Sequence, residues 1–571
     1  MPYTSPRRTL IRASSPPLLL SAGEDILSYI LSHLGIPQLA RLCICSRALR
    51  AAVAVAVEEQ LVALSAGPLV ARVGEPRLRL LRFVYAQRTV RAERGRVSGG
   101  ARHTAIVSEG GGLLTFGHGV SGELGVNSTA NHARPQRPLA SLPVRMVAAG
   151  FDFTVVVAAT GDVYSFGHGS SGQLGHGDHE SRASPAKVAA LAGHDIALVS
   201  AGGAHAMYVT ASGSLLVAGD GRYGQLGLGA VTRATVPTAV ATAGRVVDAS
   251  AGHLHTALIT HDGALHTCGD LAGGKLGLAF PADAAHVDHE IAGIARVTTL
   301  HRVDADGLRG GVKLVQVSAA VRHTAGCSSD GRYFLCGVYF GSDPTLTFLR
   351  KGSAGANTGS AATDTLGTPV PALRDARTRR VLQVVVGAHH AMILTEDGEV
   401  YSLMCDEPRP RKRYPQLGQG RADPTRNRPA LVIDGSAPLR AALIAAGQNH
   451  SVAWHPTPAP PAPGAAAAAA AAEAAAEAAA AEEAELLPSP ESAPPSPASP
   501  ARAPSSPSSP ATPPGLPPSS VYSVFGSHKY GRLAHEREVD AAHPQPVDVT
   551  GWVEAQSAVE SASETHGDAI E

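Results

Sequence analysis

The chain is poor in aromatic residues and cysteine, and the cysteines lack the spacing of a metal site. Aromatic residues make up 4% of 571 residues, so a core must come from Val, Leu, Ile and Ala. The six cysteines contain no Cys-x-x-Cys pair, which disfavours a disulfide framework or zinc ribbon and is typical of buried thiols in a reducing compartment. We therefore expect the cytoplasm or nucleus. The acid-free first 20 residues, with Arg7, Arg8 and Arg12, leave organelle import as an alternative.

The chain also lacks an excess of either charge and a long apolar run. Lys plus Arg and Asp plus Glu both number 48, which argues against binding of nucleic acid or membrane over the whole surface. The alanine tract near residue 470 is interrupted by Glu473 and Glu477, so no apolar run reaches the ~18 residues of a membrane helix. We expect no membrane binding, and the composition gives no direct evidence for nucleic-acid binding, with a local basic patch left as an alternative.

Glycine is abundant, and three stretches have the letters of a dinucleotide fingerprint. Gly-x-Gly-x-x-Gly occurs at 117/119/122, 167/169/172 and 219/221/224. A dinucleotide site needs one such loop between a strand and a helix, with an acid about 20 residues later. A phosphate-loop-like stretch, "GDLAGGKLG", has Leu276 where Ser or Thr must bind magnesium. We therefore expect no cofactor and assign backbone geometry to Gly117, Gly167, Gly219 and Gly269.

Two sequence phrases recur along the chain, and the three glycine motifs belong to the second of them. The first appears seven times, as "GARHTAIV", "GFDFTVVV", "GGAHAMYV", "GHLHTALI", "AVRHTAGC", "GAHHAMIL" and "GQNHSVAW". The copies start at Gly100, Gly150, Gly202, Gly252, Ala320, Gly387 and Gly447. The second phrase, such as "DVYSFGHGSSGQLG", follows each copy, decays in the fifth and sixth, and is displaced to residues 520–534 in the seventh.

Each repeat unit reads as short β-strands joined by glycine turns. "TVVVAAT" and "DVYSF" are strands that a tight turn around Gly161 connects. A unit of about 50 residues holds about four strands, which is one propeller blade. Seven units predict a mainly β fold, a seven-bladed β-propeller.

The paired phrases resemble the repeats of the regulator of chromosome condensation family. The resemblance covers residues 96–454 and 519–549, and it implies a seven-bladed propeller whose seventh blade is split. Residues 455–518 are rich in Ala, Pro and Ser, so we expect a disordered insertion. Its Ser-Pro pairs suggest proline-directed phosphorylation, the alternative being a plain spacer. Disorder is also expected for residues 1–17 and 550–571.

Residues 18–56 precede the repeats and resemble an F-box, a helical module that binds a Skp-type adaptor of cullin ubiquitin ligases. The features that match are "DILSYILSHL", a proline after the turn, and "LARLCICSRALR". The resemblance implies adaptor contacts by Ile26, Leu27, Ile30, Leu31, Leu34, Pro37, Leu39 and Leu42. The opening "SAGED" and Ala48, where Trp is usual, depart from the family. The alternative is a helical hairpin that packs on the propeller, and residues 57–95 are expected to be a basic helical connector.

No combination of residues predicts catalysis or metal binding. The repeated histidines lie about 50 or more residues apart, so we expect a hydrogen-bonding position in each blade rather than zinc ligands. We find no nucleophile elbow or paired carboxylates. "PRPRKRYP" offers a candidate nuclear-import patch at Arg409, Arg411, Lys412 and Arg413, or simply an exposed loop.

Two functions follow from these resemblances. The first is a non-catalytic substrate-recognition subunit of a Skp–cullin ligase, with the propeller as target-binding domain. The alternative, implied by the namesake of the repeat family, is guanine nucleotide exchange on a small GTPase bound at a propeller face. A third relative, the plant ultraviolet-B photoreceptor, senses light through a tryptophan cluster. This chain has only Trp454 and Trp552, so we exclude light sensing by that mechanism.

Overall fold

The computed structural model divides the chain into two units, and its propeller belongs to the first, Met1–His455 with Tyr522–Val547. The structure describes residues 57, 77–278, 288–291, 294–303, 313–337, 380–405, 415–419, 430–434, 437–455, 521–527 and 541–548. The F-box-like segment 18–56 and the basic patch at 409–413 lie outside the described residues. No helix among the described residues is long and apolar enough to cross a membrane.

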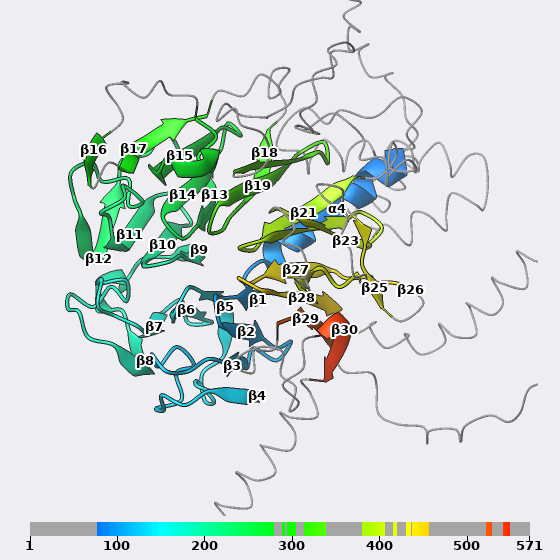
Figure 1. The fold of residues 1–571 in the computed structure, drawn as a ribbon, viewed down its shortest axis with the longest axis horizontal. Coiled ribbons are helices and arrows are strands. Elements are labelled where there is room, and N and C mark those ends of the chain that lie inside the picture. Colours follow the sequence, from blue (N-terminus) through cyan, green and yellow to red (C-terminus); the bar gives the residue numbers. More distant parts are fainter. Residues whose placement is uncertain are drawn as a thin grey trace, which may run out of the picture. The chain divides into compact units, whose positions relative to one another are not determined.

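Within the described ranges, the long helix α4 (Arg77–Glu93) precedes the sheets that form the seven blades (Figure 1). Blade 1 contains β1 (Val97–Gly99), β2 (His103–Val107), β3 (Leu113–Gly117) and β4 (His132–Gln136). Blade 2 contains β5 (Val144–Ala149), β6 (Phe153–Ala158), β7 (Val163–Gly167) and β8 (Arg182–Lys187). Blade 3 contains β9 (Ile196–Ala201), β10 (His205–Thr210), β11 (Leu215–Asp220) and β12 (Arg233–Val240). Blade 4 contains β13 (Val246–Ala251), β14 (His255–Thr260), β15 (Leu265–Asp270), β16 (Asp288–Ile291) and β17 (Ile294–Arg302).

The later blades contain the diverged repeats. Blade 5 contains β18 (Leu314–Ala319), β19 (His323–Ser328) and β20 (Tyr333–Gly337), and blade 6 contains β21 (Val381–Val386), β22 (His390–Thr395), β23 (Val400–Met404) and β24 (Ala430–Leu431). Blade 7 contains β27 (Leu443–Ala446), β28 (His450–His455), β29 (Val521–Gly526) and β30 (Ala541–Asp548). A two-stranded ribbon, β25 (Ile433–Asp434) and β26 (Ala437–Pro438), follows blade 6 in the chain. Short 3-10 turns of the described residues include η1 (Ala189–Leu191), η2 (Ala272–Gly274) and η5 (Pro415–Leu417).

The blades form a closed ring. Within each blade neighbouring strands pair antiparallel, and the innermost strands contact one another in the order β1, β5, β9, β13, β18, β21, β27 and back to β1. In blade 2 all six residues of β6 are buried, whereas the outermost strand β8 is partly exposed. Pro135, Pro185 and Pro237 lie in outermost strands, where a missing N–H protects the sheet edge from further pairing.

In blades 1, 3, 4, 6 and 7 the repeated histidine of the first phrase forms a side-chain hydrogen bond with the next blade. His103 Nε2 donates to Thr154 Oγ1 at 2.9 Å, and that hydroxyl donates to the backbone oxygen of Glu123 at 2.8 Å. The same relay joins His205 to Thr256, His255 to Thr324 and His390 to Ser451, each hydroxyl again donating to a loop carbonyl. His450 and Thr104, 2.9 Å apart, close the ring between blades 7 and 1. The histidines are therefore interblade ties, each with its proton on Nε2.

Between blades 2 and 3 this relay lacks both the histidine and the hydroxyl residue. Blade 2 has Phe153 in place of the histidine, and blade 3 has Ala206 in place of the hydroxyl residue; both are fully buried. We expect Phe153→His alone to lower the free energy of unfolding by about 2–3 kcal/mol, because the buried ring nitrogen has no hydroxyl acceptor. Adding Ala206→Thr should recover about 1 kcal/mol. Urea denaturation of the two single variants and the double variant measures this coupling, and strictly additive losses would refute it.

The glycine loops of the second phrase serve the backbone, not a ligand. Gly167 has φ +105°, and a Cβ there would lie 2.6 Å from Phe153 Cα. Gly117, Gly219 and Gly269 have φ from +116° to +121° and the same close approach to the neighbouring strand. Further along the loop, a Cβ on Gly172 would lie 2.9 Å from Thr235 Cα in blade 3. These glycines permit positive φ and let each loop pack on the next blade's outer strand.

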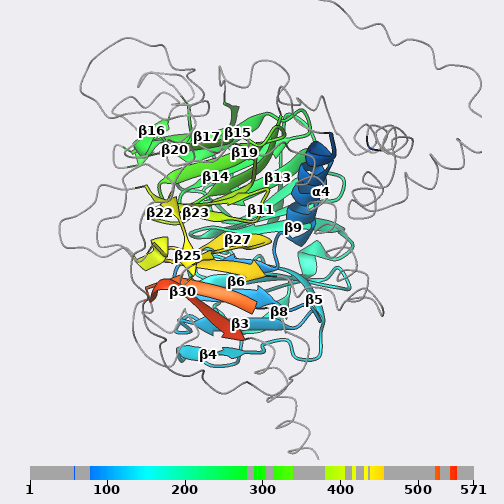
Figure 2. The same ribbon diagram turned by 90° about the vertical axis from the view of Figure 1, so that its right-hand side faces the viewer.

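Helix α4 packs against one face of the propeller, which we call the helix face; the face with the glycine loops is the loop face (Figure 2). Leu80, Leu81 and Phe83 of α4 are fully buried. Near its start, Phe83 stacks on the buried guanidinium of Arg380 at 5.0 Å, and Arg79 pairs with Glu396 at 2.7 Å.

Beyond the end of α4, Arg94 anchors the chain to blades 4 and 5. Its guanidinium pairs with Asp248 and donates to Val317 O at 2.9 Å, and Asp248 also accepts from Val317 N at 2.7 Å. Arg94 lines a cavity of about 150 Å³ that the inner strands enclose on this side of the axis. Contacts at both ends thus fix α4 across blades 4, 5 and 6.

Candidate partner-binding site on the loop face

The mouth of the propeller axis on the loop face is framed by a ring of backbone hydrogen bonds between blades. Phe151 N donates to Gly202 O at 3.0 Å, and His253 N donates to Ala320 O at 2.9 Å. Equivalent bonds run from Ala101, Gly203, Ala388 and Gln448. They frame a pocket of about 80 Å³. Since these N–H groups are already bonded, the side chains in the second position of each first phrase determine what the mouth can bind.

Two aromatic side chains meet at this mouth across a whole blade. The rings of Phe151 in blade 2 and His253 in blade 4 stack with centroids 5.0 Å apart. Gly203 of blade 3 lies between them, and a Cβ there would be 2.4 Å from the His253 ring. Burial, and then nearby Lys275, lowers the pKa of His253, so the ring is neutral at pH 7. The side chains that line the mouth are thus mostly small or aromatic, with Gln448 as a polar exception.

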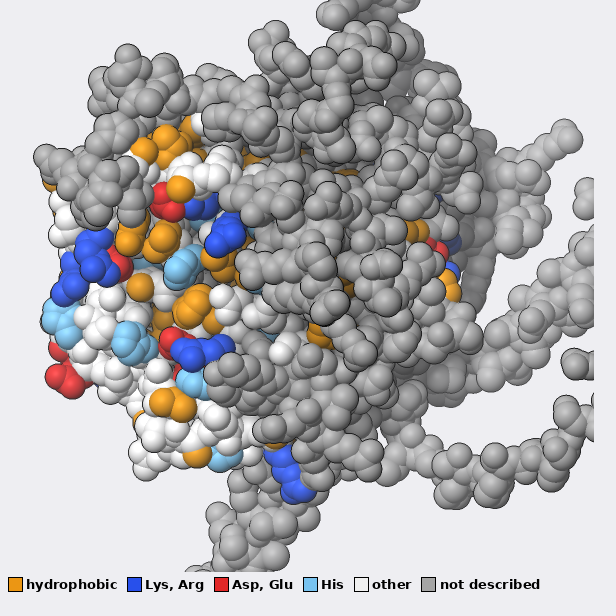
Figure 3. Space-filling model, viewed as in Figure 1, with side chains coloured by type: hydrophobic (Ala, Val, Ile, Leu, Met, Phe, Trp, Pro, Cys, Tyr) orange, Lys and Arg blue, Asp and Glu red, His pale blue; other side chains and the backbone are white. Residues whose placement is uncertain are grey.

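Ion pairs surround this mouth on blades 1 to 4. Arg102 pairs with Asp152 at 2.6 Å, Lys275 with Asp270 at 2.5 Å, and Arg222 with Asp220 at 2.8 Å. Figure 3 shows basic, acidic and histidine side chains mixed with apolar ones on this face. An apolar centre within a polar rim is the usual arrangement of a protein–protein contact surface.

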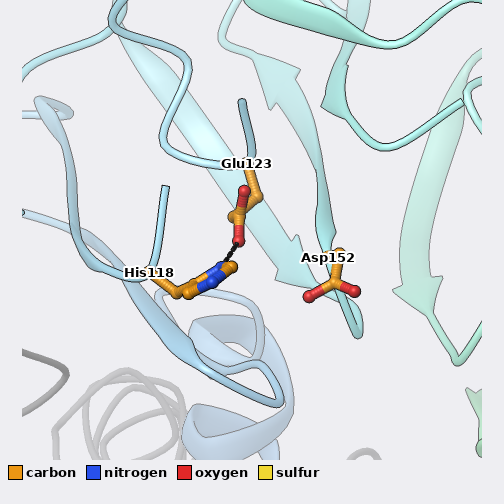
Figure 4. A group of neighbouring side chains, drawn as sticks. All are labelled: His118, Glu123 and Asp152. Carbon is orange, nitrogen blue, oxygen red and sulfur yellow. Dashed lines mark hydrogen bonds and ion pairs between the residues drawn. The ribbon is translucent and has the colours of Figure 1, made fainter. Parts of the chain in front are cut away.

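One cluster near the rim has the composition of a metal site. One ligand atom from each of His118, Glu123 and Asp152 lies within 4.8 Å of the others (Figure 4). His118 Nδ1 already contacts Glu123, whose second oxygen accepts from Ser121 N at 2.8 Å, while Asp152 pairs with Arg102. The guanidinium would repel a further cation.

The same positions in blade 2 show that this cluster closes a turn. There His168 Nδ1 bonds Gln173 at 3.1 Å, and Gln173 accepts from Ser171 N, as Glu123 does from Ser121. A carboxylate is thus not required at this position. Burial is the main cause that raises the pKa of Glu123. We assign the contacts of His118 and Glu123 to loop structure.

The described cysteines do not offer reactive thiols. Cys268, Cys327 and Cys336 are free and buried, as the sequence predicts, and Cys405 is buried. Burial raises the pKa of the first three to about 12, so their reactive thiolate form is scarce at pH 7.

The structure places the repeat glycines in the blades, but the aromatic pair at the mouth was not predicted. Phe151 and His253 stand in the first phrase, where attention to the repeated letters hides a position that varies between blades. The varied position next to a repeated glycine is the signal that could have found them. Arg94, which holds the helix, stands in a basic run that the sequence marks only as a connector.

Comparisons with known protein families match the middle of the chain. The family described as "Regulator of chromosome condensation (RCC1) repeat" matches residues 160–209 and 212–259, and a second family of the same description matches 144–173 and 196–225. The mouse and human proteins named "Regulator of chromosome condensation" are 33% and 32% identical over 105 residues, 18% of this chain. The match spans only 22% of each of these relatives.

Solved structures of similar arrangement include human WBSCR16 and Prp20p of Saccharomyces cerevisiae. The first has a TM-score of 0.49 and 19% identity, covering 62% of this chain and 84% of that one. The second has a TM-score of 0.47 and 20% identity, covering 62% and 80%, and Prp20p is described together with its binding properties to Gsp1p and histones. With the sheets described above, the repeat matches lead to one conclusion: the chain carries regulator of chromosome condensation repeats folded as a seven-bladed β-propeller.

Proposed function

We propose that the protein is a non-catalytic scaffold, the substrate-recognition subunit of a Skp–cullin ubiquitin ligase. Its F-box-like segment at 18–56 would bind the adaptor, and the loop face would bind the target. The observation that carries the proposal is the position of α4: it joins the N-terminal part to the propeller on the helix face and leaves the mouth with Phe151 and His253 available on the opposite face.

The fixed position of α4 supports the proposal that the adaptor and the target bind to different parts of the chain. A substrate receptor has to hold its target at a defined place relative to the ligase. Arg79 pairs with Glu396 near the start of the helix and Arg94 with Asp248 just beyond its end, so α4 is held at a fixed place on the propeller. No step of this function needs a nucleophile, metal or cofactor from the chain.

The proposal is tested by adaptor binding of the full-length protein. We expect the wild type to co-purify with a Skp-type adaptor and Leu31→Asp/Leu34→Asp to lose at least about 90% of it, because charge disfavours burial of these positions in an apolar interface. Full-length variants are preferable to a chain starting at residue 96, which would also lose α4. Val120→Ser, an exposed loop-face change, is the control. Wild type that retains no adaptor contradicts the proposal.

A second candidate is guanine nucleotide exchange on a small GTPase. The family matches cover residues 144–259, which include Phe151, Gly203 and His253 of the axial mouth. We expect this activity, if the loop face carries it, to appear as faster release of labelled GDP from small nuclear GTPases. Phe151→Ala/His253→Ala should lower that rate at least about tenfold, as loss of an interface hot spot does. Unchanged GDP release with the wild type excludes this function without affecting the adaptor test.

A further inference from the structure

The solvent side of α4 carries arginines without an acidic partner among the described side chains. Arg82, Arg88 and Arg91 are exposed, and Arg245, just before β13, is exposed beside Arg91. The acid within α4, Glu93, contacts Arg96. Other arginines occupy nearby acids of the helix face: Arg79 pairs with Glu396, Arg94 with Asp248 and Arg302 with Asp262. Within the part of the chain that the structure describes, no carboxylate therefore pairs with these four exposed guanidiniums.

Two of these arginines are held in place by backbone carbonyls. Arg91 Nη2 donates to Val247 O at 2.9 Å, and Arg245 Nη2 donates to Ala211 O at 2.8 Å. Each of these bonds uses one donor, and a guanidinium has five. Their like charges lie close together, since burial and then Arg245 and Arg88 lower the pKa of Arg91. An anion between them would relieve this repulsion.

We propose that Arg88, Arg91 and Arg245, called here the arginine surface, bind an acidic polypeptide segment of a partner protein. Guanidinium groups bind carboxylates in a two-point geometry that lysine cannot provide. Tyr85, 36% exposed on the same side of α4, adds an apolar contact. This surface lies on the helix face, opposite the mouth with Phe151 and His253, and it is independent of the function proposed for that mouth.

The extent of the arginine surface favours a peptide over nucleic acid. Arg88 and Arg91 are three residues apart, less than one turn of α4, and Arg245 lies beside Arg91. Three arginines make fewer contacts than the about 6–10 phosphate contacts of a protein whose DNA binding depends steeply on salt. The chain as a whole has no net charge that would attract a polyanion from a distance.

The test is binding of a fluorescein-labelled decaglutamate peptide to the full-length protein, followed by anisotropy at low ionic strength. We expect saturable binding that weakens as NaCl is added, since salt screens exposed charges. Arg88→Glu/Arg91→Glu should weaken it about tenfold or more, because repulsion replaces attraction. Arg245→Gln, which removes charge without reversing it, should weaken it about threefold.

A control variant separates this surface from the effect of net charge. Arg182→Glu/Arg233→Glu makes the same change in charge at the starts of β8 and β12, near the loop face, and should alter peptide affinity less than about twofold. Failure of decaglutamate to bind the wild type overturns the proposal, as does equal weakening by the control. Tighter binding of a 20-base-pair DNA duplex, lost in the Arg88→Glu/Arg91→Glu variant, overturns it in favour of nucleic acid.

Discussion

We expect the propeller to lose stability steeply below about pH 6.5 and to unfold near pH 5, a window set by histidines that are buried without charge. Burial lowers the pKa of His103 and His205 to about 4 and of His390 to about 3, and it lowers that of His255 well below its usual value. In the unfolded chain the pKa of each returns to about 6.5. The unfolded state therefore binds more protons, and stability falls with pH from about 6.5 towards about 4.

The hydrogen-bond relay explains why these rings resist protonation. Each Nε2–H donates to a hydroxyl that itself donates to a carbonyl, so an added proton must go to Nδ1. The Nδ1 atoms of His103, His205, His255 and His390 are buried without a hydrogen-bond partner. A proton on Nδ1 would place an unpaired N–H and a charge inside the ring of blades, and both are unfavourable.

The expected magnitude is comparable with the whole stability of a protein. Each group contributes about 1.4 kcal/mol per pH unit within its window, so four together approach about 5 kcal/mol per unit. Globular proteins have only about 5–15 kcal/mol in total. Glu123 acts in the opposite direction, because its raised pKa favours the folded state as pH falls, but it is a single group against four.

Urea denaturation at pH 7.0, 6.0 and 5.5, followed by circular dichroism, measures this dependence. His205→Gln keeps a side-chain donor near Thr256 but does not titrate, so we expect about one proton less to be taken up on unfolding. His194→Gln replaces an exposed histidine and is the matched control. A urea midpoint that does not change between pH 7.0 and 5.5 would show that the buried rings do not control acid stability.

The sequence predicts the propeller well because each blade repeats the same physical problem. The seven copies of the first phrase predicted seven blades. The histidine at the same position in six of these copies predicted a structural hydrogen bond. The split of the last blade was also predictable, since "SVYSVFG" follows the Ala/Pro/Ser-rich stretch. In the structure this segment is β29, which is the neighbour of β28 in the sheet. Repetition fixes what neighbouring blades share.

What differs between blades could not be predicted in this way. The stack of Phe151 on His253 depends on blade 3 having Gly203 between them, a relation between three repeats that no single repeat contains. The place of α4 depends on Arg380, which lies more than 280 residues after the helix in the sequence. Its buried guanidinium lies over the Phe83 ring. The F-box-like segment and the patch at 409–413 lie outside the described residues, so both stay predictions.

The glycine fingerprint at 167–172 permits the sharpest test of the idea that these loops serve structure rather than a ligand. We expect Gly167→Ala to lower the free energy of unfolding by about 3 kcal/mol or more. Alanine would have to adopt φ +105°, and its Cβ would lie 2.6 Å from Asp152 O and from Phe153 Cα, which are backbone atoms at the start of a paired strand. Neither can move without disturbing the pairing of β6 with β7.

Two other glycines of the chain separate the contributions to this loss. Gly161 has φ +92° but nothing within 4 Å of the position that an alanine methyl would occupy, so Gly161→Ala should show only the backbone strain, about 1–2 kcal/mol. Gly110 is exposed, has neither positive φ nor a neighbour within 4 Å, and should tolerate alanine within about 0.5 kcal/mol. The order of loss in urea denaturation should therefore be 167, then 161, then 110. Equal stability of Gly167→Ala and Gly110→Ala would mean that backbone geometry does not require glycine at 167, and the ligand interpretation of the fingerprint would return.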